Sequence, residues 1–125
     1  ELYLTSYNNF NMRKIEAIIR KSKFGEVKRA LIEEGFNSFN YHLTRSISEK
    51  SEKRFYRGIE YDAKSSDRVQ LSLYINYQDL DRAITIIKDA GRTGDADDNF
   101  IYVLAIDSGY QLLGGNDSDK LKEIK

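Results

Sequence analysis

The feature that most constrains the fold is an alternating strand followed at once by an amphipathic helix. Apolar residues occupy every second position from Val69 to Ile75, which predicts a strand with one buried face. Apolar residues then recur at helical spacing over residues 80–90, and Gly91 is expected to end that helix. Asn76, with Asp79 three residues later, is expected to cap its start. A strand and a helix that each bury one face predict a layered protein containing both.

The first part of the chain repeats this arrangement. Residues 13–20 alternate and predict a strand, and residues 23–34 show a helical apolar face. Ser22 is the expected N-cap of that helix, and Gly35 the expected C′ residue. The aromatic-rich residues 36–43 then predict a second strand.

The remaining segments differ in polarity. Residues 45–67 lose all periodicity, and the polar run 46–54 has too little apolar surface to order itself. A loop this long in a small domain is usually functional or mobile. Residues 100–106 predict a further strand, residues 109–113 a short one, and residues 116–125 a charged tail that is a short helix or a frayed end.

This order of elements predicts an α+β fold, a ferredoxin-like split β-α-β (βαββαβ), with an antiparallel sheet and two helices on one face. The other face must then be polar or paired. Tyr74 and Tyr102 are predicted on that second face, where aromatic side chains commonly meet a partner subunit.

Composition limits the functional classes. The chain has 125 residues, 20 basic and 20 acidic side chains, no cysteine and one histidine. One domain is expected, without disulfides, thiolate metal sites or a histidine cluster for zinc. Acidic residues interleave the basic ones over residues 13–29, so no nucleic-acid stripe is predicted. No apolar run is long enough to insert into a membrane, and no signal peptide is evident, which favours a cytoplasmic protein.

Two further expectations follow from rare residues. Met12 is the only methionine, and residues 1–11 before it are either a native extension or an added segment. His42 is the only histidine and the chain has no cysteine, so neither a Ser/His/Asp nor a Cys/His catalytic group can be assembled. The protein is therefore not expected to be an enzyme. His42 itself is predicted to be structural, or at most to line a cleft.

The segment from Gly91 to Asn99 joins the second helix to the strand at Phe100, and such loops commonly hold ligands in α/β proteins. Gly and Asn are expected to supply positive φ, and exposed amides there can wrap an anion. Three interpretations stay open: a solvated acidic turn, a nucleotide or other small ligand bound in an altered way, or a divalent cation. The oxygen ligands for a cation would be Asp95, Asp97, Asp98 and Asn99.

Four stretches of the chain together resemble the P-II nitrogen-regulatory signal-transduction family. They are Met12-Arg-Lys-Ile-Glu-Ala-Ile-Ile-Arg20, Glu26-Val-Lys-Arg-Ala-Leu31, Phe55-Tyr-Arg-Gly-Ile-Glu-Tyr61 and Arg92-Thr-Gly94. The resemblance covers residues 12–115, nearly the whole chain, as one domain before the tail of residues 116–125. The Tyr-Arg-Gly-x-Glu-Tyr stretch and the Arg-Thr-Gly stretch in register make it specific.

The resemblance implies a homotrimer whose sheets pack inward and whose intersubunit clefts hold ATP or ADP. The family's T-loop would be about residues 45–67, and it would insert into a transporter or an enzyme. The B-loop would be residues 92–99, and the C-terminal loop would lie near residues 109–115. Tyr56 and Arg57 would then be T-loop contacts.

Tyr61 matches the family's modifiable T-loop tyrosine. It is therefore either a modification site or a loop aromatic that packs or docks on a partner. The resemblance names the residue but does not decide between these two roles.

The B-loop departs from the family pattern Thr-Gly-Lys-x-Gly-Asp-Gly-Lys. Thr93 and Gly94 match it. The substituted positions are Asp95 for a lysine, Asp97 and Asn99 for glycines, and Phe100 for the second lysine. This exchange removes cations and adds carboxylates where a polyphosphate would have to be neutralised.

The C-terminal loop departs as well, because Gln111 and Leu113 stand at the positions of two family arginines. Arg68 and Arg92 are the cations that remain. Unit charges a few ångströms apart are worth roughly 1–4 kcal/mol in partly solvated surroundings. Weakened ATP and ADP binding is therefore expected, and the glutamine with which the family helps bind 2-oxoglutarate and magnesium has no clear equivalent.

Two functions remain in view. The first is a P-II-like trimeric regulator that controls a transporter or metabolic enzyme through its T-loop, with altered nucleotide binding. The alternative is a P-II-fold trimer that binds a different small ligand or a divalent metal without nitrogen signalling.

Overall fold

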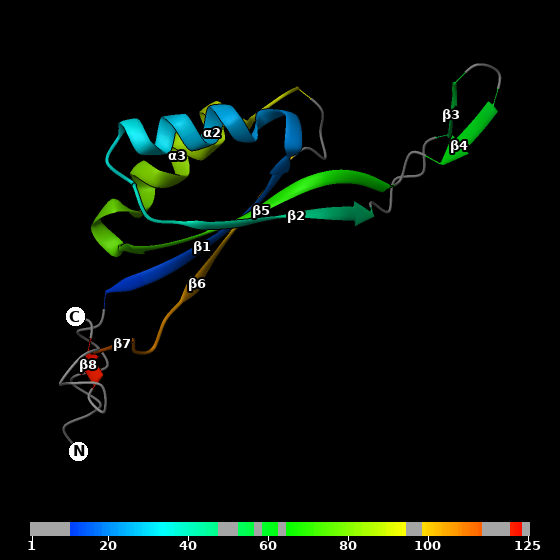
Figure 1. The fold of residues 1–125 in the computed structure, drawn as a ribbon. Helices are drawn as coiled ribbons and strands as arrows, with labels where there is room; N and C mark the ends of the chain where they lie inside the picture. The colour runs from blue at the N-terminus through cyan, green and yellow to red at the C-terminus, as the bar shows by residue number, and fades with distance from the viewer. Residues whose placement is uncertain are drawn as a thin grey trace.

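The computed structural model describes residues 11–47, 53–56, 59–62, 65–94, 99–113 and 121–123. Their elements, in chain order, are β1 (Met12–Arg20), α2 (Lys21–Glu33), β2 (Asn40–Ile47), β3 (Lys53–Tyr56), β4 (Ile59–Asp62), β5 (Ser65–Asn76), the 3₁₀ turn η1 (Tyr77–Asp79), α3 (Leu80–Gly91), β6 (Phe100–Ala105), β7 (Tyr110–Leu112) and β8 (Leu121–Glu123). Figure 1 shows their arrangement.

Four of the strands form one antiparallel sheet in the order β2-β5-β1-β6. Both helices lie on the same face of this sheet (Figure 1). The register of β1 on β5 runs from Met12 opposite Asn76 to Arg20 opposite Arg68. These findings confirm the predicted ferredoxin-like α+β fold.

The core lies between the sheet and the helices. On β1 every second residue is buried, which places one face of the strand against α2 and α3 and confirms the predicted alternation. Burial of this apolar surface is the main force that holds the two layers together. The core residues are Ile15, Ala17, Ile19, Val27, Leu31, Phe36, Val69, Leu71, Leu73, Ile75, Ala83 and Ile87.

Helix α2 ends as predicted but begins earlier. Gly35 has a φ of +91°, and its N–H donates to the carbonyl of Ile32 at 3.1 Å. The N–H of Phe36 donates to the carbonyl of Leu31 at 2.9 Å, which completes a Schellman motif. The prediction of Ser22 as the N-cap is wrong, because β1 runs directly into the helix and Ser22 already lies in its first turn.

The second strand starts four residues later than predicted, at Asn40 instead of Phe36. Phe36 is buried in the core directly after the turn at Gly35, and Phe39 packs against the core. Both aromatic residues therefore pack on the core before β2 begins, instead of pairing in the sheet.

Helix α3 confirms the predicted apolar stripe and the predicted end of the helix, but not the predicted cap at its start. Neither Asn76 nor Asp79 makes a side-chain capping hydrogen bond. Asp79 instead accepts from Arg82 Nη2 at 3.5 Å. Gly91 is the last residue of α3, which confirms the prediction that the helix ends there. The positive φ expected of glycine in the segment 91–99 is wrong for Gly91 and for Gly94.

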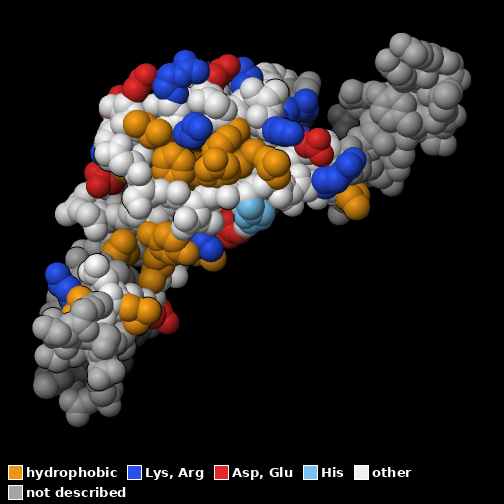
Figure 2. Space-filling view, viewed as in Figure 1, with side chains coloured by type: hydrophobic (Ala, Val, Ile, Leu, Met, Phe, Trp, Pro, Cys, Tyr) orange, Lys and Arg blue, Asp and Glu red, His pale blue; other side chains and the backbone are white. Residues whose placement is uncertain are grey.

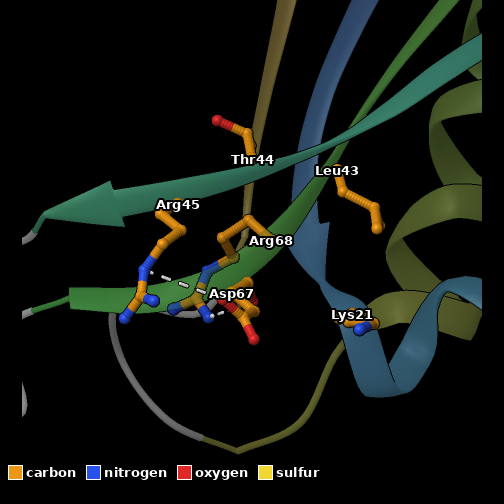
Figure 3. A pocket seen from close by; sticks show the side chains of 6 residues that line it. All are labelled: Lys21, Leu43, Thr44, Arg45, Asp67 and Arg68. Atoms are coloured by element: carbon orange, nitrogen blue, oxygen red, sulfur yellow. Dashed lines mark hydrogen bonds and ion pairs between the residues drawn. The ribbon is translucent and has the colours of Figure 1, made fainter.

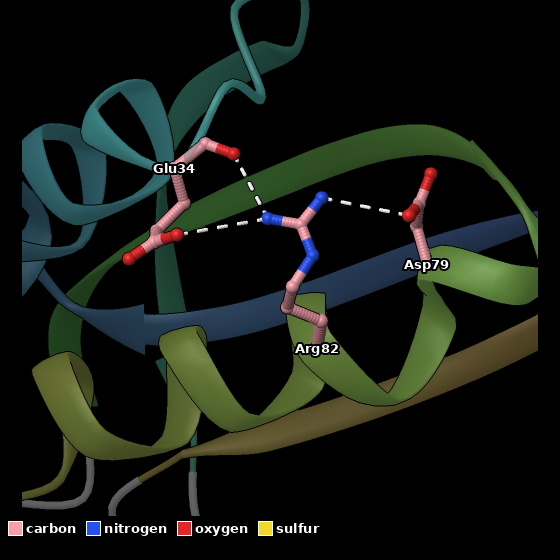
Figure 4. Close-up of polar contacts among 3 residues, drawn as sticks. All are labelled: Glu34, Asp79 and Arg82. Carbon is pink, nitrogen blue, oxygen red and sulfur yellow. Dashed lines mark hydrogen bonds and ion pairs between the residues drawn. The ribbon is translucent and has the colours of Figure 1, made fainter.

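Arg82 joins the end of α2 to the start of α3 (Figure 4). Its Nη1 donates to the carbonyl of Glu34 at 2.9 Å and lies 3.8 Å from Glu34 Oε2. Its guanidinium also lies 4.3 Å from the ring centroid of Phe36. One side chain therefore connects two helix ends and covers an aromatic core residue.

The predicted unstructured loop contains paired strands. The prediction that residues 46–54 do not order is wrong at Ser46 and Ile47, the last two residues of β2, and at Lys53 and Arg54, the first two residues of β3. Short strands within such a segment still satisfy their backbone groups by pairing, as β3 and β4 do from Lys53 opposite Asp62 onward. Figure 1 shows this hairpin beyond the ends of β2 and β5, away from the helices.

The short strand predicted over residues 109–113 is confirmed by β7. The helix or frayed end predicted for residues 116–125 is wrong at Leu121–Glu123, which forms β8 and pairs with β7. Backbone pairing with β7 explains why this segment is a strand, because such pairing does not depend on an apolar face in the sequence.

The face of the sheet opposite the helices is exposed in this single chain. Tyr74 lies opposite Lys14, and Tyr102 lies opposite Glu16, on the side away from the buried residues of β1. Tyr74 is 51% exposed and Tyr102 52%. Both therefore lie on the uncovered face, as predicted. Figure 2 shows apolar side chains at the surface over β6, and others along the boundary between α2 and β2.

Candidate functional site

A pocket of about 310 Å³ lies where the N-terminus of α2 meets the ends of β2 and β5 (Figure 3). The pairing of β2 with β5 brings these residues together, because it sets Thr44 opposite Arg68 and Arg45 opposite Asp67. The lining residues are Lys21, Leu43, Thr44, Arg45, Asp67 and Arg68.

Positive charge dominates this pocket, with three cationic side chains and one carboxylate. Arg45 Nε lies 3.8 Å from Asp67 Oδ1. Arg68 Nη1 donates to the backbone carbonyl of Asp67 at 3.3 Å. A small anion carrying carboxylate or phosphate groups fits this charge balance better than a cation does.

The sequence predicted Arg68 as a cleft residue but missed Lys21 and Arg45. Arg45 was missed because the second strand was expected to end at Leu43, which left the pairing of Arg45 with Asp67 unseen. Lys21 is the first residue of α2, two residues before the expected start of that helix. The register of β2 on β5 is the signal that would have found the site.

Asn99 ties together three segments near the other candidate loop. Its Oδ1 accepts from the backbone N–H of Arg20 at 3.3 Å, at the junction of β1 and α2. Its Nδ2 donates to the carbonyl of Gly91 at 2.7 Å, at the end of α3. The amide of Asn99 thus bonds to the chain, although the sequence placed it in a nucleotide cleft.

Gly91 is required by close packing. A Cβ at this position would lie 3.3 Å from Val27 Cγ2 and 3.6 Å from Ile19 Cγ2. The glycine therefore lets the end of α3 approach β1 and α2 closely.

The other predicted residues of loop 92–99 do not line the pocket described above. Arg92 is exposed, and its N–H donates to the carbonyl of Lys88 at 3.2 Å. Thr93 is half-buried and Gly94 is exposed. Among the described residues, this pocket is therefore lined by Arg68 but not by Arg92, Thr93, Gly94 or Asn99. Asp95, Asp97 and Asp98 lie outside the described residues.

The predicted partner-contact residues fall on the β3–β4 hairpin. Tyr56 is the last residue of β3, and Tyr61 lies in β4 opposite Arg54. Arg57 lies outside the described residues.

The remaining predicted features concern metals and the C-terminal loop. Within the described ranges, no three His, Asp or Glu side chains are grouped as metal ligands, and the acidic residues predicted for a cation lie outside those ranges. Gln111 is exposed on β7 and Leu113 is half-buried just after it. None of the helices seen in the described part is both long and apolar enough to cross a membrane.

Comparison with known proteins decides the family. A scan against protein-family models finds no match. The nitrogen regulatory protein P-II of Rhodospirillum rubrum is 35% identical over 105 residues, which cover 83% of this chain and 94% of that protein. The chain belongs to the P-II family. The nitrogen regulatory protein P-II 1 of Methanothermobacter thermautotrophicus is similar as well, 36% identical over 93 residues that cover 74% of this chain and 81% of that protein.

A solved P-II structure agrees with the fold. The crystal structure of Arabidopsis thaliana PII bound to citrate has a TM-score of 0.59 and covers 84% of this chain and 86% of that chain. Its sequence is 19% identical, so this likeness concerns the fold. The resemblance drawn from the four sequence stretches is thereby confirmed.

Proposed function

We propose that this P-II family member regulates a partner protein, a membrane transporter or a metabolic enzyme, through the T-loop of residues 45–67. The observation that carries the proposal is the β3–β4 hairpin, which Figure 1 places away from the helices. A paired hairpin offers a preformed backbone surface to a partner and loses less entropy on binding than a disordered loop. We propose the cytoplasm as its location and regulation, not catalysis, as its role.

We further propose that adenine-nucleotide binding is weakened. Asn99 stands where the family has a glycine, and its amide bonds to Arg20 and Gly91. Phe100, at the position of a family lysine, is 49% exposed and stacks with Tyr102 at a centroid distance of 6.3 Å. These residues supply no positive charge for a polyphosphate.

We propose a homotrimer assembled through the exposed face of the sheet. Phe100, Tyr102 and Leu104 lie on this face of β6, and each is at least 41% exposed in the single chain. A row of exposed apolar side chains on one strand is typical of a subunit interface.

A second candidate ligand is a small polycarboxylate or phosphate at the pocket that holds Lys21, Arg45 and Arg68. The excess of positive charge there favours it. The solved P-II structure from Arabidopsis thaliana is described as bound to citrate, which is a ligand of this class.

The T-loop proposal is tested by replacing residues 53–62 with a Gly/Ser linker of equal length. The tagged full chain and the variant are compared in pull-downs from cells that express their natural gene neighbours. Partners are expected with the full chain and not with the variant, while Arg29→Glu on the exposed side of α2 keeps them. Retention of every partner by the linker variant would contradict the T-loop role.

The ligand is tested by thermal unfolding with ATP, ADP and citrate in parallel, because a ligand that binds only the folded state raises the unfolding temperature. Citrate is expected to stabilise the wild type and to lose this effect in Arg45→Ala. Stabilisation by ATP or ADP instead would contradict weakened nucleotide binding.

A further inference from the structure

Asn99 lies where the pairing between β1 and β6 stops. The described pairs of these strands run from Arg13 opposite Ala105 to Ile18 opposite Phe100. Two residues further along β1, the N–H of Arg20 donates to the side chain of Asn99. The side-chain amide of Asn99 therefore accepts a backbone hydrogen bond from β1 just beyond the last residue pair of the two strands.

The same amide also holds the end of α3. A helix leaves its last carbonyls without partners inside the helix, and the carbonyl of Gly91 accepts from Asn99 Nδ2 at 2.7 Å. The two bonds use opposite ends of the amide, an acceptor toward Arg20 and a donor toward Gly91. Exchanging O and N would leave both contacts unfavourable, so the two partners fix the orientation of the side chain.

These contacts join parts of the chain that are distant in sequence. Asn99 and Arg20 are 79 residues apart, whereas Asn99 and Gly91 are 8 apart and bound the segment of residues 92–98. Asn99 is half-buried, where hydrogen bonds are worth more than in open solvent. Both ends of the segment are thus attached to each other and to the start of α2.

We propose that Asn99 is a positioning residue that holds both ends of the B-loop in place from within the chain, so that no bound anion is needed to hold them. This rests on the proposed function, which it deepens by naming the contact that makes the loop ends independent of a nucleotide. A ligand that used the amide of Asn99 would first have to break both bonds.

The test compares Asn99→Ala, Asn99→Asp and the control Asn40→Asp, which changes an exposed asparagine at the start of β2. The first measurement is hydrogen exchange at the backbone amide of Arg20. It is expected to become about tenfold faster in Asn99→Ala, because its acceptor is lost. In Asn99→Asp it stays slow, since a carboxylate still accepts. Unchanged exchange in Asn99→Ala overturns the proposal.

The second measurement is the unfolding temperature of the same variants as a function of pH. At neutral pH the carboxylate of Asn99→Asp faces the carbonyl of Gly91, which raises its pKa in the folded state and destabilises that state. Below about pH 4, where a carboxyl of ordinary pKa is protonated, it can donate to this carbonyl, and the loss relative to wild type shrinks. The proposal is overturned if the decrease in unfolding temperature of Asn99→Asp does not vary with pH. It is also overturned if Asn40→Asp shows the same decrease.

A third measurement separates this proposal from the proposed function. Exchange at the amide of Arg20 in the wild-type protein is expected to stay within about twofold when millimolar MgATP is added. Slowing by about tenfold overturns the proposal, because the nucleotide would then be holding the loop end. If ATP raises the unfolding temperature while this exchange is unchanged, weakened nucleotide binding fails and the role of Asn99 stands.

Discussion

Replacing Arg82 with alanine should destabilise the protein more than any other change of a single exposed side chain on its helices. The guanidinium donates to the carbonyl of Glu34 at 2.9 Å and lies 4.3 Å from the ring centroid of Phe36. Its ion pairs with Glu34 and Asp79 are longer, at 3.8 and 3.5 Å. The contacts with Glu34 and Phe36 join the end of α2 to the start of α3, whereas the ion pair with Asp79 lies within the start of α3 (Figure 4).

The hydrogen bond to the carbonyl should contribute about 1 kcal/mol and the stacking on the ring about 0.5–1 kcal/mol. The two ion pairs are partly exposed, with Arg82 47% exposed, so together they add only about 0.5 kcal/mol. The free energy of unfolding should therefore fall by about 2 kcal/mol. Arg82→Lys should lose about half of this, because an ammonium cannot bond to both helix ends and stack on the ring together.

Urea unfolding at a fixed protein concentration measures this difference, with Arg29→Ala as the matched control on the exposed side of α2. Salt at 1 M should remove only the ion-pair share, since the Debye length is then about 3 Å. If Arg82→Ala falls within about 0.5 kcal/mol of Arg29→Ala, the assigned contacts do not stabilise the fold.

Three further predictions concern packing and assembly. Gly35→Ala should lower the free energy of unfolding by about 1–2 kcal/mol in urea titrations because φ is +91°, and Gly35→Asn should cost less. Gly91→Ala should lower the free energy of unfolding by about 1 kcal/mol, because the new Cβ would lie 3.3 Å from Val27 Cγ2. The double variant Gly91→Ala/Val27→Ala should lose less stability than the two single variants together, because the smaller side chain at residue 27 makes room for this Cβ. Tyr102→Glu should reduce the mass measured by light scattering from about three times 14.5 kDa toward one chain, whereas Tyr41→Glu on the other face should not.

Local patterns were enough to predict the elements with a buried face. Residues 69–75 alternate and residues 80–90 carry an apolar stripe, and each falls within an element of the predicted type, β5 and α3. Gly35 was found because only a residue without Cβ readily adopts a φ of +91°. Each of these signals depends on neighbours within one turn or one strand.

Features decided by distant contacts could not be predicted. Phe36 looked like a strand residue because its role in covering the end of α2 depends on the turn at Gly35 and on Arg82. The strands β3 and β4 have four residues each, which is too short for a clear alternation, and they are held together by backbone pairing. The division of the chain into residues 1–11, 12–115 and 116–125 stays a prediction.

Only part of the site was predicted, because its other residues are brought together by contacts between distant parts of the sequence. Arg68 was found from its match to the family, but Arg45 joins it only through the register of β2 on β5. Asn99 was assigned to a ligand because its hydrogen-bond partner Arg20 is 79 residues away in the sequence. Whether Asp95 and Asp97 contact a ligand stays a prediction.

The weakening of nucleotide binding is the central claim, and thermal unfolding with increasing MgATP tests it most directly. A ligand at one hundred times its Kd stabilises the folded state by about 2.7 kcal/mol, so micromolar affinity would be evident at millimolar ATP. The double variant Asp95→Lys/Phe100→Lys, which restores the two family lysines, serves as the comparison. We expect no shift for the wild type and a rise in unfolding temperature for the double variant. A rise of several degrees for the wild type at millimolar ATP would contradict the account.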